Sequence, residues 1–305
     1  MAFFVQDTAN YTRRSEASEL LCSDDVFARL IRARGCPSQR PDASVVIPVN
    51  AQGDLENARF IVNDLAHYQG DHALEVVLMI NNYEANDPPR EIDELAELGV
   101  AVVADPAIRR PAEAPGLTAR VYGTRSAAAD VVILFDADCR LLNPTALIDW
   151  YITTYQAGAQ LAYSHVDYYD MRDTLPNRVR ICVHHMARWF KRSVLRIPTV
   201  RGSNYAIDRT MFLQLYDDGW LADDMNVGPT CRAMRAKLAY SAAQEHAVLT
   251  SGRMFSGTSW IRLNRYFLYR FRYNWRVLRA RPHAARYTHR EADPVRRYIN
   301  NRPVS

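Results

Sequence analysis

The sequence has few cysteines, almost no lysine and no long hydrophobic run. The cysteines are odd in number and widely spaced, and none belongs to a Cys-x-x-Cys pair: Cys22, Cys36, Cys139, Cys182 and Cys231. This pattern argues against a disulfide framework and against a structural zinc site. We therefore expect five free thiols.

Long apolar segments are also missing. No window reaches the roughly 18 apolar residues of a membrane span, and the first residues lack the basic and apolar segments of a secretory signal. Internal repeats and low-complexity runs are absent, and 48% of the 305 residues are hydrophobic, which excludes a disordered chain. We expect a soluble, cytoplasmic protein, with peripheral contact at the inner face of the membrane as a variant.

Positive charge is concentrated near the end of the chain. From Arg253 onward there are thirteen arginines against Glu291 and Asp293, a net charge of +11, so the total of +4 leaves −7 for everything before. Lysine occurs only at Lys191 and Lys237. No nucleic-acid-binding motif accompanies the basic tail, so we expect no nucleic-acid partner.

Apolar strands alternate with amphipathic helices from residue 43 onward. The expected strands are 44–50, 75–80, 100–103, 131–135, 160–168, 200–207 and 247–250. The expected helices are 55–65, 91–98, 116–129, 144–156, 210–216 and 225–236. This alternation predicts an α/β fold with a doubly wound, mostly parallel sheet flanked by helices.

Three regions follow from this pattern. An N-terminal arm, 1–41, contains one expected helix at 25–34. The main domain covers 42–253 and includes an Arg- and His-rich insertion at 170–198, which we expect on the acceptor side of the active face. A basic, aromatic helical tail occupies 254–305.

Two carboxylates follow the strand at 131–135, in the stretch Asp136-Ala137-Asp138. Open α/β sheets place their ligands at the carboxyl ends of their strands. Two carboxylates there suit Mg²⁺ or Mn²⁺ better than zinc, with waters and a diphosphate completing the coordination. An ordinary surface turn is the alternative, because Asp-x-Asp also arises by chance.

Several short motifs occur in a recognisable order. They are Pro48-Val49-Asn50 after the first strand, Asn81-Asn82 after the second, Gly116 to Arg120 at a helix start, Asp136-Ala137-Asp138, and Asp223-Asp224. In this order the chain resembles the family 2 glycosyltransferases with a GT-A fold, over about residues 43–253. The resemblance implies a Rossmann-like GT-A domain and a hexosyltransferase that uses a nucleotide-sugar donor and a hydroxyl-bearing acceptor.

The resemblance also implies roles for individual residues. Pro48, Val49, Asn50, Asn81 and Asn82 would hold the nucleotide, and Asn81 stands where the family usually has Asp, which leaves UDP, dTDP and GDP sugars open. On the same basis, Gly202 and Ser203 would begin a strand beside the donor diphosphate. Some GT-A enzymes have a histidine as a third metal ligand, and His246 is the corresponding candidate; a structural or exposed histidine is the alternative.

The chemistry can be argued from the residues as well. A divalent ion held by Asp136 and Asp138 would stabilise charge on a departing nucleoside diphosphate, and Arg120 would add a fixed positive charge unless it faces solvent. An inverting transfer needs a carboxylate base for the acceptor hydroxyl. Asp224, paired with Asp223, is the candidate, and helix capping is the alternative. A retaining transferase and a non-catalytic binding protein are the other functions considered.

The tail combines two stripes at helical spacing. One contains large apolar residues and the other arginines: Trp260, Leu263, Phe267, Phe271, Trp275 and Leu278, against Arg262, Arg265, Arg272, Arg276 and Arg279. This predicts a basic amphipathic helix. It could pack on the main domain, contact an anionic membrane, mediate self-association or face an anionic acceptor.

Overall fold

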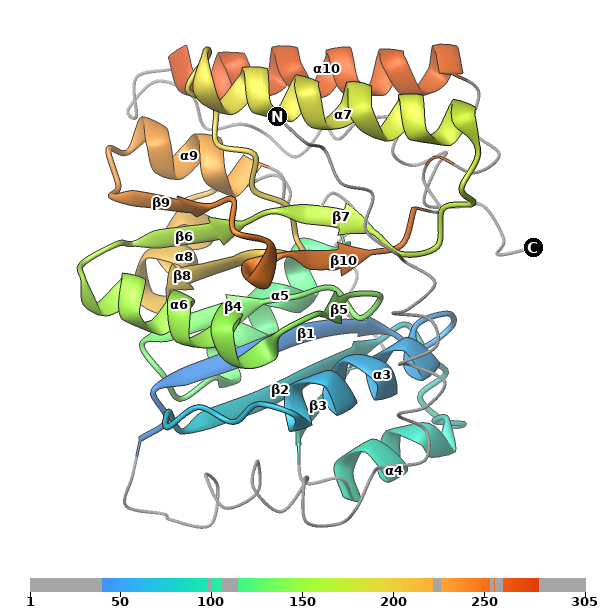
Figure 1. The fold of residues 1–305 in the computed structure, drawn as a ribbon. Coiled ribbons are helices and arrows are strands. Elements are labelled where there is room, and N and C mark those ends of the chain that lie inside the picture. The colour runs from blue at the N-terminus through green and yellow to red at the C-terminus, as the bar shows by residue number, and fades with distance from the viewer. Residues whose placement is uncertain are drawn as a thin grey trace.

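A seven-stranded sheet forms the centre of the molecule (Figure 1). The computed structural model describes residues 40–97, 100–105, 115–221, 226–252, 255 and 260–279, so the expected helix at 25–34 lies outside it. The strand order is β3-β2-β1-β4-β8-β6-β9. Their bounds are β1 Ala43–Asn50, β2 Leu74–Asn81, β3 Ala101–Asp105, β4 Val131–Leu134, β6 Leu161–Ser164, β8 Tyr205–Asp208 and β9 Leu238–Ser241.

Most neighbouring strands run parallel, and β8 is the exception. The strands β1 to β4 pair in parallel, and β6 pairs in parallel with β9. In contrast, β8 lies antiparallel between β4 and β6. The predicted α/β class with a mostly parallel sheet is therefore confirmed.

Helices cover both faces of this sheet. On one face lie α3 (Leu55–Ala66), α4 (Arg90–Glu97) and α6 (Pro144–Gln156), and on the other α5 (Pro115–Ser126), α8 (Arg209–Asp217) and α9 (Val227–Ala233). Along β1, Val45 and Ile47 enter the first layer and Val46 the second. Burial on both sides explains why these strands have uninterrupted apolar sequences.

A second, three-stranded sheet has the order β5-β10-β7, with β5 at Arg140–Leu141, β7 at Val166–Tyr168 and β10 at Val248–Thr250. The single strand expected at 160–168 is thus two strands, β6 and β7, which join different sheets on either side of His165. The pairing partners differ, which local apolar sequence does not reveal.

Other boundaries also differ from the expectation. The strand expected at 200–207 is only β8, because residues 201–204 form a turn in which the Asn204 side chain accepts a hydrogen bond from the Arg201 N–H at 3.0 Å. The short strand β9 was not expected. The helix expected at 225–236 is described as the shorter α9, which is followed by β9 and by the 3₁₀ turn η2 (Gln244–His246).

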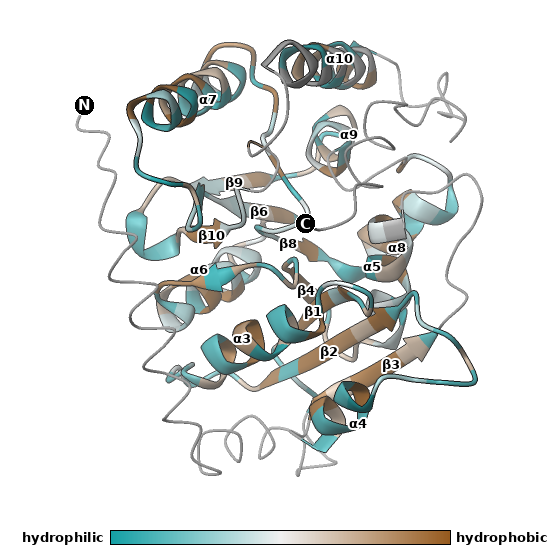
Figure 2. Ribbon diagram, turned by 90° about the vertical axis from the view of Figure 1, so that its right-hand side faces the viewer, coloured by the Kyte–Doolittle hydropathy of each residue, from teal (hydrophilic) through white to brown (hydrophobic). Residues whose placement is uncertain are grey.

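Two long helices lie beyond the β9 edge of the sheet, α7 (Leu175–Ser193) and α10 (Trp260–Arg279) (Figures 1 and 2). The ring of His184 on α7 lies 5.2 Å from that of Phe267 on α10, and Lys191 Nζ lies 5.8 Å from the centre of the Phe271 ring. The helices expected in the insertion and in the tail are therefore neighbours. Among the helices of the described ranges, none is long and apolar enough to cross a membrane.

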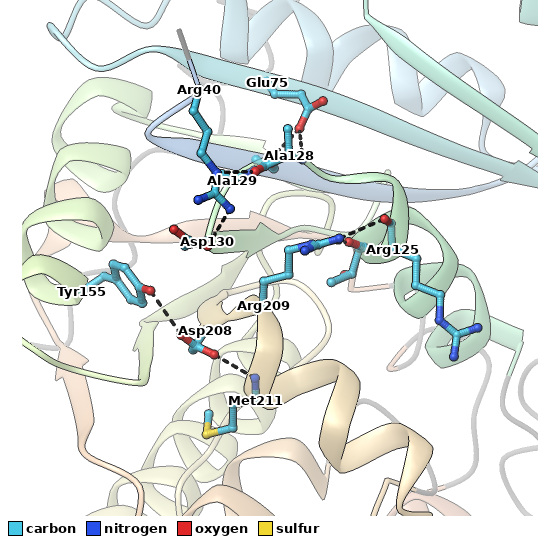
Figure 3. Close-up of polar contacts among 12 residues, drawn as sticks. Arg40, Glu75, Arg125, Ala128, Ala129, Asp130, Tyr155, Asp208, Arg209 and Met211 are labelled. Atoms are coloured by element: carbon cyan, nitrogen blue, oxygen red, sulfur yellow. Dashed lines mark hydrogen bonds and ion pairs between the residues drawn. The ribbon is translucent and has the colours of Figure 1, made fainter.

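Polar contacts fix the amino end of β4 (Figure 3). Arg40 pairs with Asp130 at 2.6 Å and donates to the Ala128 carbonyl at 2.9 Å. Asp208, at the end of β8, caps α8 by accepting the Met211 N–H at 2.7 Å. These contacts hold β4 in place at its amino end, and the Asp136–Asp138 loop follows its other end.

Candidate active site

The two aspartates after β4 lie beside a buried arginine. Arg120 on α5 is 1% exposed and forms an ion pair with the carboxylate of Asp136, whose side chain is 37% exposed. Asp138 is buried and its Oδ1 accepts a hydrogen bond from Thr250 Oγ1 on β10 at 3.3 Å. The structure therefore favours a buried, carboxylate-paired Arg120 over the solvent-facing alternative.

Asp136, Asp138 and Cys139 each offer one possible ligand atom, and these atoms lie within 4.8 Å of one another. Burial raises the pKa of the Cys139 thiol, as do the two carboxylates, so the thiol keeps its proton. The two carboxylates are suitable ligands for a hard divalent cation such as Mg²⁺ or Mn²⁺, whereas the protonated thiol is not a ligand for such an ion. The residues present therefore fit the expected metal.

Asparagine side chains gather at the ends of the two neighbouring strands. Asn50 and Asn81 are register partners at the ends of β1 and β2, and Asn82 Nδ2 donates to Asn50 Oδ1 at 2.8 Å. Asn82 has a left-handed backbone with φ of 63°. Asn is among the residues that tolerate this conformation best.

The predicted nucleotide residues thus meet at one edge. Pro48 and Val49 belong to β1, which continues past the proline to Asn50. The sequence analysis missed Asp105, which ends β3 as the register partner of Asn81. Its position after an apolar strand was the available signal, and it adds a carboxylate to this edge.

Ser203 also lies near the Asp pair. Ala137 and Ser203 are buried, and the Ser203 carbonyl accepts the Cys139 thiol hydrogen at a sulfur–oxygen distance of 3.8 Å. Gly202 and Ser203 lie in the turn before β8 rather than in a strand. The sequence expectation was therefore wrong about their secondary structure, while the turn still places Ser203 against the loop after β4.

Comparisons with known proteins address the fold. No protein-family profile matches the sequence, and no curated protein sequence matches it. A mannosyltransferase from Pyrobaculum calidifontis in complex with GDP-Man and Mn²⁺ has a similar structure, with a TM-score of 0.50, 18% identity, and coverage of 88% of this chain and 75% of that one. The glucosyl-3-phosphoglycerate synthase of Mycobacterium tuberculosis, in complex with Mn²⁺ and UDP-glucose, gives a TM-score of 0.47 at 16% identity, over 81% and 82% of the two chains.

The chain has a GT-A fold. The mostly parallel sheet flanked by helices agrees with the fold expected from the sequence. The candidate metal loop of this GT-A domain lies at the carboxyl end of β4, where open α/β sheets place their ligands.

His246 lies elsewhere in the GT-A domain. Its ring stacks on Trp150 of α6 at 5.2 Å between centroids, its Nδ1 lies 2.7 Å from Ser241 Oγ, and its Nε2 lies 3.7 Å from a carboxylate oxygen of Glu245. The metal-ligand group around Asp136 and Asp138 does not include it. The third-ligand role of His246 stays a prediction, and in this structure its ring packs against α6.

Asp223 and Asp224 lie outside the described residues, between Leu221 and Asn226. Asn226 is buried and donates to the Trp220 carbonyl at 3.1 Å.

The free cysteines among the described residues are Cys139, Cys182 and Cys231, as expected from the sequence.

A second group, missed by the sequence analysis, comprises His165, Asp167 and His185, whose possible ligand atoms also lie within 4.8 Å of one another. Burial, then the positive charge of Arg188, lowers the pKa of His165 to about 4. Burial opposes ionisation of Asp167, but the hydrogen bond and charge of His185, together with the Tyr168 N–H and the charge of His165, outweigh it and lower the pKa of Asp167. The nearby guanidinium of Arg188 disfavours binding of a metal cation by this group. The Asp167–His185 contact at 3.4 Å instead anchors α7 to β7.

Proposed function

We propose that this chain is a metal-dependent glycosyltransferase that moves a sugar from a nucleotide-sugar donor to a hydroxyl group of an acceptor, with inversion at the anomeric carbon. The observation that carries the proposal is the convergence of Asp136, Asp138 and buried Arg120 at the carboxyl end of β4, one strand away from the Asn50–Asn82 contact. The GT-A fold supports it. The proteins of similar structure are transferases in complex with Mn²⁺ and GDP-Man or UDP-glucose.

Each group has a distinct task in this proposal. The amide side chains of Asn50, Asn81 and Asn82 bind the nucleoside, and both donor and acceptor atoms of an amide are available for a base or ribose. Asp136 and Asp138 hold Mg²⁺ or Mn²⁺, which when bound stabilises negative charge on the departing diphosphate. Arg120 fixes the carboxylate of Asp136.

The transfer breaks the bond between the anomeric carbon and the phosphate oxygen, and the electron pair leaves with the nucleoside diphosphate. The acceptor oxygen forms the new bond to the anomeric carbon from the opposite face. Its proton passes to the carboxylate of Asp224, the proposed base, while Asp223 caps the following helix or contacts the acceptor. A retaining transferase would not need Asp224 in this role.

Nucleotide screening and two variants test the proposal. In thermal unfolding with Mn²⁺, one of UDP, GDP and dTDP should raise the Tm by mass action. Asp138→Asn should reduce Mn²⁺-dependent release of nucleotide from the cognate sugar donor about 100-fold or more. Asp130→Asn, before the same strand and paired with exposed Arg40, is the matched control and should keep the parent rate.

Asp224→Asn separates binding from chemistry. It should keep the Tm rise with nucleotide and Mn²⁺ but lose transfer, whereas Asp218→Asn, at the end of α8, should keep both the Tm rise and transfer. Parent-level donor turnover in both Asp138→Asn and Asp224→Asn would disprove the site assignment. Absence of any nucleotide response in the parent protein would disprove the function.

A further inference from the structure

A group of buried cations lies between α7, α10 and the turn before β8. Arg188 on α7 and Arg270 on α10 are buried, and Lys191 and Arg201 are half-buried. Arg188 donates to the Val166 carbonyl at 3.1 Å. Among the described residues, no carboxylate forms an ion pair with Arg188, Lys191 or Arg201, which is unusual for buried charge.

Hydrogen-bond donors also outnumber acceptors here. Arg201 Nη2 lies 2.8 Å from His184 Nε2, and because a guanidinium only donates, this nitrogen accepts and the ring is neutral. The Tyr168 hydroxyl lies 3.2 Å from the same nitrogen. Two donors therefore converge on one lone pair, whereas an anion with several oxygens would accept from both.

The charges affect one another. Burial, followed by the charges of Arg270, Arg201 and Arg188, lowers the pKa of Lys191 to about 8. Burial and the same guanidinium of Arg201 lower the pKa of Arg188 to about 10. Both shifts have the sign expected for buried cations that lie close to one another.

This group is next to the proposed donor site. Thr250, which donates to Asp138, is the register partner of Tyr168, and Tyr168 contacts His184. Arg201 and Ser203 belong to one turn, and the Ser203 carbonyl contacts the loop after β4. The strands β7 and β10 thus lie between Asp138 and a ligand bound by Arg201.

We propose that Arg188, Lys191 and Arg201 bind a phosphate group of the acceptor, which positions the acceptor hydroxyl against the donor sugar. The identification of the ligand as the acceptor rests on the transferase activity proposed above. The phosphate site itself is inferred from the geometry of these side chains. Arginine pairs with phosphate in a bidentate manner, and lysine adds a point charge. The phosphate belongs either to a soluble ester or to a lipid headgroup.

Inorganic phosphate is the probe for the site itself. With the full chain in EDTA and at constant ionic strength, phosphate should raise the Tm saturably in the parent and in Asp138→Asn. Arg201→Gln and Lys191→Gln should weaken the apparent affinity at least tenfold. The same substitution at exposed Arg232 on α9 should leave it unchanged.

The outcomes separate the two proposals. If Arg201→Gln and Lys191→Gln both respond like Arg232→Gln, the phosphate site is wrong. If these variants lose the response but no nucleotide sugar is ever turned over, the site stands and the transferase function fails. Competition by phosphatidic acid vesicles, lost in Arg201→Gln, would assign the phosphate to a lipid, and its absence would assign it to a soluble ester.

A different observation concerns α7, whose ribbon lies at the outside of the molecule and mixes hydrophilic and hydrophobic residues (Figure 2). Five residues of α7 and the residue that follows its end recur at spacings of three or four and form an apolar face, with exposures between 47% and 75%: Leu175, Val179, Val183, Met186, Phe190 and Val194. Trp189 is exposed as well. A contiguous apolar face of this length marks a contact surface.

The charge around this face restricts what covers it. The sequence of α7 has five basic residues and no acidic one, and that of α10 has six and none. A second copy docked face to face would bring these cations together. Residues 1–39 have five arginines against five acids, and residues 280–305 have a net charge of +4, so neither supplies complementary charge.

We infer that the apolar face of α7 rests on an anionic lipid surface. A basic amphipathic helix with aromatic residues lies in the plane of such a surface, with its apolar side in the acyl boundary and its cations at the headgroups. This assigns the membrane contact to α7, whereas the sequence suggested the C-terminal helix.

Vesicle flotation tests this surface. At low salt the full chain should float with phosphatidylglycerol vesicles, and it should float much less with phosphatidylcholine alone or at high salt. Met186→Glu should reduce the bound fraction at least fivefold. Met234→Glu, the same change at a similarly exposed methionine after α9, should not.

Equal flotation of both variants, or none by the parent protein, would overturn this surface. Sedimentation velocity tests the alternative that a second copy of this chain covers the apolar face. If the parent is a dimer and Met186→Glu makes it a monomer, the face is a contact between copies and the lipid inference is wrong.

Discussion

Two buried arginines on different helices have different partners. Arg120 belongs to α5, which packs on the half of the sheet that contains β1 to β4. Its charge is matched by the carboxylate of Asp136. Arg188 belongs to α7, and its hydrogen-bond acceptor is the backbone carbonyl of Val166. In the first region the protein itself balances the charge, and in the second the balance is left to a ligand.

The two arginines therefore affect stability in different ways. A buried cation is costly unless it is paired, so an ion pair such as Arg120–Asp136 contributes to holding α5 against the loop after β4. An unmatched cation such as Arg188 lowers the stability of the empty protein and raises its affinity for an anion. The first arrangement stabilises the fold, and the second prepares a site.

The largest effect is expected at Arg120. Arg120→Met should lower the free energy of unfolding by about 2 to 4 kcal/mol, because it leaves Asp136 without its partner, although the partial exposure of that carboxylate limits the loss. Urea unfolding measures this. Arg125→Met on the same helix is the control, since its pair with Asp217 is exposed on both sides and should contribute less than about 1 kcal/mol. Equal losses in the two variants would contradict the balanced role of Arg120.

A smaller effect is expected at Gly123 on α5. A methyl group there would lie 2.5 Å from Val46 Cγ1 and 3.4 Å from Met79 Cβ, both on buried strands. Gly123→Ala should therefore destabilise the protein by about 1 to 2 kcal/mol through overpacking, despite the better helix propensity of alanine. Gly53→Ala, where no atom lies within 4 Å, should change stability by less than about 0.5 kcal/mol. A neutral Gly123→Ala would mean that α5 can move away from the sheet.

The sequence predicted the first half of the fold better than the second. Strands such as β1 and β4 are buried on both faces, so their sequences are uninterrupted apolar runs that indicate their position in the sheet. The helix α6 was predicted with both its ends, because Asn143 caps it and Pro144 begins it. The division of 160–168 into β6 and β7 was missed, since it depends on pairing with distant strands.

The candidate site divides in the same way. Asp136, Asp138, Asn50 and Asn82 could be placed together from the sequence because the ends of adjacent parallel strands share one edge. The contacts of His246 with Trp150 and Ser241 could not be predicted, since distance along the chain does not determine the course of the loop after β9. The cations around Arg188 come from two helices and a turn far apart in sequence, so only the tertiary structure brings them together.

Acid should destabilise the α7 side of the molecule. Burial and Arg188 lower the pKa of His165 from 6.5 to about 4, and His185, Asp167 and Arg192 are the other charged or titratable groups that act on it. Because the unfolded chain binds this proton first, stability should be intact above pH 6.5 and fall by at least about 1 kcal/mol as the pH drops towards 4. Urea unfolding across this range should show the fall, and His165→Asn should flatten it. An unchanged slope in the variant would contradict this origin.

The smallest change in stability is expected at Arg188. Its size shows whether Arg188 differs from Arg120 in having no balancing charge within the protein. Arg188→Met removes one hydrogen bond to the Val166 carbonyl, which costs about 1 kcal/mol, but it also removes a buried charge that no described carboxylate balances. In phosphate-free buffer the free energy of unfolding should therefore change by less than about 1 kcal/mol, in either direction. In phosphate the parent should gain stability and Arg188→Met should not, so the two unfolding curves diverge only when the anion is present. If Arg188→Met instead loses about 3 kcal/mol without phosphate, the protein already balances this charge, and the two arginines are alike.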